Sequence, residues 1–199
     1  MNNNKGFSLV ELIVVIAIMA VLVGTLAPAY LRYVEKSNIQ KDVDTLYKIQ
    51  DALKLEYASG EYTQESLLND VFGASATNNM IDMRVKGEFV LQVNKDGTVQ
   101  KVWGRNTFVP GDFTYDAVEN AGIDAASIAS GKKIKLFKSK ALREAISKSS
   151  SNGYKFITMN LSDDGEIKVW IGSRSENNGK HSKNSLPDSR FAVGEMVYN

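Results

Sequence analysis

The chain has 199 residues and a formal net charge of +1, with no cysteine and a single histidine. A nearly neutral balance gives no general reason to expect nucleic-acid binding. The lack of cysteine excludes disulfides, thiol catalysis and cysteine-based metal sites. The length that follows the apolar N-terminal stretch suits one domain of ordinary size.

An apolar stretch covers residues 6–28, behind a short polar leader at residues 1–6. Residues 12–31 would form a helix of ~30 Å, which matches the hydrocarbon layer of a bilayer. Glu11 lies at the start of this stretch, where an unpaired charge costs about 2.5–3.5 kcal/mol. Gly24 and Pro28 predict a bend or local melting, because proline removes a backbone donor.

A second, amphipathic pattern follows without a strong break. Apolar residues recur every three or four positions, and the residues between them, such as Lys41, Asp42 and Lys48, are charged. Gly60 is a suitable helix terminator. We therefore expect one long helix over residues 7–59, about 80 Å long. Its buried stripe is predicted to consist of Ile39, Val43, Leu46, Ile49, Leu53 and Tyr57.

The remaining chain predicts strands and short helices. Two hairpins are expected, at residues 88–103 around Asp96-Gly97 and at residues 154–171. Ser139 is expected to cap a helix. The pattern predicts an α+β fold, in which the long N-terminal helix packs on an antiparallel β-sheet. Further helices are expected at residues 66–72, 115–121 and 140–148, and further strands at residues 133–137 and 191–198.

The N-terminal residues resemble a known family. Residues 5–12 read KGFSLVEL, and an apolar run and Pro28 follow. This arrangement is similar to the prepilin signature of type IV pilins and type II secretion pseudopilins, and the likeness covers about the first 30 residues. It implies that a prepilin peptidase cuts after Gly6 and methylates the new amine of Phe7. It also implies that Glu11 pairs with the Phe7 amine of a neighbouring subunit, and that Pro28 marks a bend in the helix.

The resemblance implies an organisation into a leader (1–6), a transmembrane and filament-core helix (7–34) and a globular pilin domain (35–199). The expected function is that of a structural subunit of an extracellular type IV pilus-like filament. The alternatives are a pseudopilin of a type II secretion or competence system, and a minor pilin that binds DNA or a surface. The precursor would cross the cytoplasmic membrane once, and the implied partners are copies of itself, the peptidase and the inner-membrane pilus assembly machinery.

One basic tract is a candidate for surface binding, to nucleic acid or to a host surface. Alternating lysine and apolar residues equally suit an edge strand whose outward lysines discourage further pairing. The tract contains Lys132, Lys133, Lys135 and Lys138.

Other polar residues predict no chemistry. Asp163, Asp164 and Glu166 are oxygen ligands of the kind that calcium prefers, but they stand where a hairpin turn is expected. His181 lies alone in a polar loop. The sequence contains no catalytic set, phosphate-binding loop or metal-ligand spacing, so we expect no enzyme, no cofactor and no metal.

Overall fold

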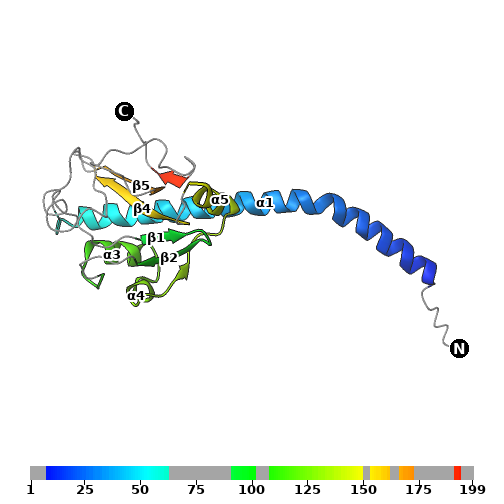
Figure 1. Cartoon of the computed structure of the whole chain (residues 1–199), viewed down its shortest axis with the longest axis horizontal. Helices are drawn as coiled ribbons and strands as arrows, with labels where there is room; N and C mark the ends of the chain where they lie inside the picture. Colours follow the sequence, from blue (N-terminus) through cyan, green and yellow to red (C-terminus); the bar gives the residue numbers. More distant parts are fainter. Residues whose placement is uncertain are drawn as a thin grey trace. The chain divides into compact units, whose positions relative to one another are not determined.

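A computed structural model of the protein describes residues 8–62, 91–101, 108–149, 153–161, 166–172 and 191–193. The chain forms two compact units, Met1–Ser37 and Asn38–Asn199. The first contains most of the apolar half of the N-terminal helix, and the second contains the sheet and the short helices (Figure 1).

The long helix α1 runs over Leu9–Ala58, close to the predicted limits, while Phe7 lies outside the described residues. Its helical assignment continues through Gly24 and Pro28. The structure is thus helical at both residues, and the bend or local melting expected there stays a prediction.

Within the residues that the structure describes, six antiparallel strands form one sheet in the order β3-β2-β1-β4-β5-β6. Both predicted hairpins are confirmed: Val93 pairs with Val99 in the first, and Ile157 pairs with Ile171 in the second. Residues 88–90 and 102–103 of the first hairpin and 194–198 of the predicted last strand lie outside the described residues. The strands are β1 (Leu91–Asn94), β2 (Thr98–Lys101), β3 (Ile134–Lys135), β4 (Tyr154–Leu161), β5 (Ile167–Gly172) and β6 (Ala192–Val193).

In the described part of the chain, three short helices lie between the strands. The predictions at residues 115–121 and 140–148 correspond to α3 (Phe113–Asn120) and α5 (Lys140–Ser149). The predicted Ser139 cap is confirmed, because its hydroxyl accepts a 3.2 Å hydrogen bond from the Leu142 N–H. The sequence did not predict α4 (Ala125–Ala129). The helix expected at residues 66–72 lies outside the described residues.

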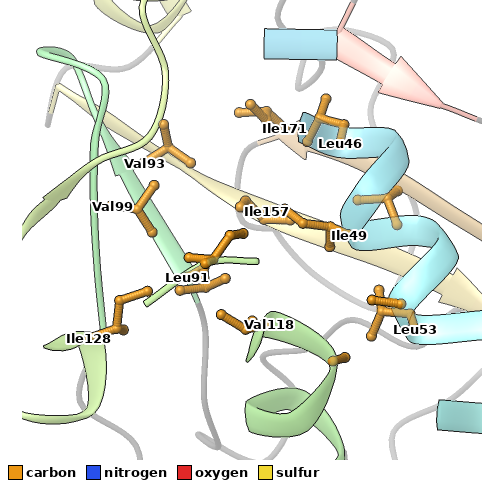
Figure 2. Close-up of a cluster of buried hydrophobic side chains, with 14 of the residues drawn as sticks. Leu46, Ile49, Leu53, Leu91, Val93, Val99, Val118, Ile128, Ile157 and Ile171 are labelled. Carbon is orange, nitrogen blue, oxygen red and sulfur yellow. The ribbon is translucent and has the colours of Figure 1, made fainter. Parts of the chain in front are cut away.

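The core lies between the second half of α1 and the sheet (Figure 2). Leu46, Ile49 and Leu53 are almost fully buried there, as the stripe predicted, and Val43 and Tyr57 pack at its margin. Each large apolar side chain buried in this way contributes about 1.5–3 kcal/mol. Sheet residues on the same face complete the core, among them Leu91, Val93, Val99, Ile157, Ile167, Val169 and Ile171.

Two polar residues of α1 are also buried, which the sequence pattern did not predict. Asp42, expected among the charged residues between stripe positions, is 1% exposed, and Gln50 is 4% exposed. The Gln50 side-chain amide donates a 2.6 Å hydrogen bond to the Ile167 carbonyl. Burial of a polar group is tolerated when its hydrogen bonds are made. Gln50 therefore fastens α1 to strand β5.

Candidate assembly site on the N-terminal helix

The start of α1 is capped by two neighbouring side chains. The Glu11 carboxylate accepts a 2.9 Å hydrogen bond from the Ser8 N–H, and the Ser8 hydroxyl accepts a 3.2 Å bond from the Val10 N–H. This reciprocal arrangement is a capping box, which satisfies donors that the first helical turn leaves free. Gly6 and Phe7, the expected cleavage and methylation residues, lie outside the described residues.

Glu11 retains capacity for a further partner. A carboxylate has about four acceptor sites, and its bond to Ser8 uses one of them. The positive end of the helix dipole also favours a negative charge at this position. Glu11 therefore caps its own helix and keeps acceptor sites for a further hydrogen bond.

The apolar surface of α1 is uncovered. Every large apolar side chain from Leu9 to Tyr33 is at least 45% exposed. By length and composition alone, α1 is able to cross a membrane. A contiguous apolar surface of this size is unusual on a soluble monomer and marks an interaction with lipid or protein.

Gly24 and Pro28 form a weak point within this helix. Pro28 has no N–H, so the Gly24 carbonyl, four residues earlier, has no donor from its own helix. A side-chain carbon added at Gly24 would meet nothing within 4 Å. The Thr25 hydroxyl donates a 3.0 Å hydrogen bond to the Leu22 carbonyl in the same turn. Substitution here would thus act on the backbone of α1 without disturbing a packed contact.

The four lysines of the basic tract are all exposed, but they lie beside different neighbours. Lys135 donates from its ammonium group to the Asp96 carbonyl. Hydrogen bonds from the Ser127 side chain and backbone lower the pKa of Asp124, and the charge of Lys132 adds to this effect. Lys133 is exposed immediately before β3. The edge-strand interpretation is confirmed for β3, which is one edge of the sheet.

Lys138, the fourth lysine, meets α1 through a contact that sequence reasoning missed. The backbone N–H groups of Lys138 and Ser139 each donate a 2.8 Å hydrogen bond to the buried Asp42 carboxylate. The spacing contained a signal for the burial of Asp42, though not for its partners. Asp42 stands between Ile39 and Leu46 at intervals of three and four residues, which places it on the buried face.

No metal site was found in the described part of the chain, which contains no group of three His, Cys, Asp or Glu residues suited to a metal ion. Glu166 is exposed and forms a 3.3 Å ion pair with Lys168. Asp163, Asp164 and His181 lie outside the described residues.

Comparison with known proteins agrees with the N-terminal geometry. Residues 1–27 match the family described as the prokaryotic N-terminal methylation motif. The chain is 27% identical over 107 residues to a fimbrial protein of Pseudomonas aeruginosa, which covers 51% of this chain and 68% of that protein. It is 31% identical over 97 residues to fimbrial protein Q of Moraxella bovis, which covers 44% of this chain and 62% of that protein. No solved structure matches the chain significantly.

Proposed function

Since the chain belongs to the type IV pilin family, we propose that it is the structural subunit of an extracellular type IV pilus-like filament, with no enzymatic role. The observation that supports this proposal most directly is the uncovered apolar surface of α1, with Glu11 at its start. Copies of α1 that pack together would bury this surface. Each large side chain so buried would contribute about 1.5–3 kcal/mol, which is ample to hold subunits together.

The proposed pathway has two successive environments for α1. The precursor spans the cytoplasmic membrane once, and a prepilin peptidase removes residues 1–6 by cleavage after Gly6 and methylates the amine of Phe7. The inner-membrane assembly machinery then transfers residues 7–34 from the bilayer to the filament core. Residues 35–199 form the globular domain, which faces the exterior in the assembled filament.

Glu11 would set the register between subunits. In the apolar core, its carboxylate pairs with the Phe7 amine of a neighbouring copy, because a buried charge left without its partner costs about 3–5 kcal/mol. This pairing joins different surfaces of two copies. Such contacts generate a helical filament where the rotation does not close into a ring.

Mass spectrometry of fibres sheared from cells tests the proposal. The expected mature chain begins with N-methylated Phe7, and Gly6→Val should abolish both processing and fibres. Asn3→Ala, a matched change within the leader, should leave both unaffected. Fibres composed of chains that still carry residues 1–6 would contradict the proposal.

A second candidate function is that of a minor pilin or competence pseudopilin that binds DNA or an anionic surface. It is favoured by the exposure of Lys132, Lys133, Lys135 and Lys138. Filaments would then bind DNA at low salt, with an affinity that falls as salt rises. Replacing Lys132, Lys133 and Lys135 by alanine should remove this binding, and filaments that do not bind DNA at low salt would exclude it. A type II secretion pseudopilin shares the same N-terminal features, and the neighbouring genes distinguish it.

A further inference from the structure

Charge is unevenly distributed along the chain. Residues 132–148 contain seven of the 24 basic residues and one of the 23 acidic residues, so this segment has a net charge of +6 while the whole chain has +1. The remainder of the chain is therefore net acidic. The overall composition does not show this separation of charge. In the second unit, the fold places a group of basic residues and a group of acidic residues at different positions along α1.

A basic end, which we define as Lys41, Lys138, Lys140 and Arg143, forms where α5 meets α1. Asp42 binds the backbone at Lys138 and Ser139, which places these residues beside Lys41. The Arg143 guanidinium donates a 3.3 Å hydrogen bond to the Ser139 carbonyl. The three lysines are exposed. Negative charges of the described residues near this end include the buried Asp42, the exposed Asp44, which binds Gln40, and Glu144, which lies 3.3 Å from Lys140.

An acidic end, which we define as Glu56, Glu61, Asp112, Asp116 and Glu119, forms where α3 meets the C-terminal part of α1. The Tyr62 hydroxyl donates a 3.1 Å hydrogen bond to the Gly111 carbonyl, and the Asn120 amide donates a 2.5 Å bond to Glu56. Burial raises the pKa of Tyr62, and the nearby negative charges of four of these carboxylates raise it further. Those four carboxylates are Asp116, Glu61, Asp112 and Glu56.

The two ends are separated along the axis of α1. Asp42 and Glu56 are 14 positions apart on this helix, which corresponds to about 21 Å. Figure 1 shows α5 beside one end of the second half of α1 and α3 beside the other. Among its described residues, the second unit therefore has a basic end towards Asn38 and an acidic end towards Tyr62.

We propose that, in the filament, the basic end of each globular unit contacts the acidic end of a second copy of this chain. Subunits whose α1 helices run parallel and are displaced along their axes present opposite charges to one another at this contact. Complementary charges fix the register and disfavour wrong arrangements, since like ends repel. The contact joins two different surfaces, so it propagates along the filament. This inference rests on the proposed filament function.

Cross-linking of filaments tests the contact directly, because the natural chain has no cysteine. Filaments that contain both Lys138→Cys and Glu61→Cys are treated with a bis-maleimide whose spacer is too short to join the two ends of one chain. The expected product is a ladder of dimers, trimers and larger species. Each single variant, and the pair Lys138→Cys with Lys48→Cys, should remain monomeric, since Lys48 lies on α1 between the two ends. Filaments of normal length without such a ladder would overturn the proposal.

Charge reversal gives a second readout. The pair Lys138→Glu and Lys140→Glu should lower the yield of sheared filaments several-fold, as should the pair Glu61→Lys and Glu119→Lys, and the four changes together should restore most of the yield. A loss that the fourfold variant does not restore would show that the basic end has another partner, such as anionic lipid headgroups, and would overturn the proposal. If filaments form with every charge reversal but not with Gly6→Val, the contact between the two ends is excluded and the proposed function is not. Filaments that tolerate Gly6→Val would instead exclude the proposed function.

Discussion

Asp42 and Ser139 are 97 positions apart in the chain, yet the Ser139 N–H donates a 2.8 Å hydrogen bond to the Asp42 carboxylate. The second carboxylate oxygen accepts from the Lys138 N–H at the same distance. Asp42 is 1% exposed, so both bonds are shielded from water. Hydrogen bonds to an ionised acceptor are stronger than neutral ones. This contact joins α1 to the beginning of α5.

Asp42→Ala should lower the free energy of unfolding by about 3 kcal/mol, because it leaves two backbone donors without their acceptor. Denaturation of the full chain in detergent, followed by tryptophan fluorescence, measures the change. Asp44→Ala is the matched control: Asp44 is exposed on the same helix and accepts one bond, from Gln40. It should cost less than about 0.5 kcal/mol. Equal losses in the two variants would refute a special role for Asp42.

Gly97 should tolerate no side chain. Its φ is +80°, and an added Cβ would overlap the Phe137 carbonyl oxygen. Its own carbonyl accepts hydrogen bonds from the Leu136 and Phe137 N–H groups, so the turn cannot easily move away. Gly97→Ala should therefore destabilise the protein by about 3 kcal/mol or more, since backbone strain and overpacking add together.

Gly60→Ala is the control that separates these two causes. Gly60 has the same φ of +80°, but an added Cβ would meet nothing within 4 Å. In this variant the free energy of unfolding should fall only by the cost of a left-handed backbone at alanine, about 1–2 kcal/mol. Thermal unfolding of the two variants and the natural chain in one detergent compares them. If Gly97→Ala were no less stable than Gly60→Ala, the close approach to Phe137 would be without consequence.

Tyr62 should make the protein less stable in alkali. Burial, followed by the negative charges of Asp116, Glu61 and other carboxylates, raises its pKa above the ordinary value of 10.0. The unfolded chain then loses this proton at a lower pH than the folded chain. The contribution of protonated Tyr62 to the free energy of unfolding is complete below pH 10 and declines as the pH rises above it.

Tyr62→Phe should reduce the loss of thermal stability between about pH 9 and 11. At neutral pH it should cost about 1 kcal/mol, because the hydrogen bond to the Gly111 carbonyl is lost. Tyr47→Phe is the control, since Tyr47 is exposed on α1 outside the acidic end. An unchanged alkaline slope in Tyr62→Phe, measured by the melting temperature at each pH, would show that Tyr62 does not titrate as expected.

The sequence predicted the long helix and both hairpins because their signals extend over many residues. Leu46, Ile49 and Leu53 repeat at helical spacing and are buried as expected. Asp42 has the same spacing, but its charge predicts a solvent-exposed side chain unless donors for its carboxylate oxygens are known. These donors are the Lys138 and Ser139 N–H groups, which lie 96 and 97 positions away, so no local pattern reveals them. Helix α4 has only five residues, too few for a periodic signal.

The candidate site shows the same division between local and distant information. Glu11 and Pro28 stand out in the sequence, because a charge and a proline are costly in an apolar helix. The basic and acidic ends combine residues from α1 with residues from α5 and α3. Their grouping depends on tertiary contacts, such as the bond from Asn120 to Glu56. The sequence showed the basic tract, but it did not show that the four lysines of the tract lie beside different neighbours in the fold.

Glu11→Gln separates the two uses of Glu11. The glutamine side-chain oxygen can accept the Ser8 N–H that Glu11 accepts at 2.9 Å, so the helix cap is retained while the charge is lost. If charge pairing with the Phe7 amine drives assembly, Glu11→Gln should fail to form filaments as completely as Glu11→Ala. Both precursors should still accumulate in the membrane fraction. Ser8→Ala, which removes the hydroxyl bound to Val10 but keeps the carboxylate, should assemble. Sheared-fibre yield, normalised to membrane precursor, measures all three variants. Normal fibres from Glu11→Gln would show that Glu11 acts by capping its own helix and that the charge pair is dispensable.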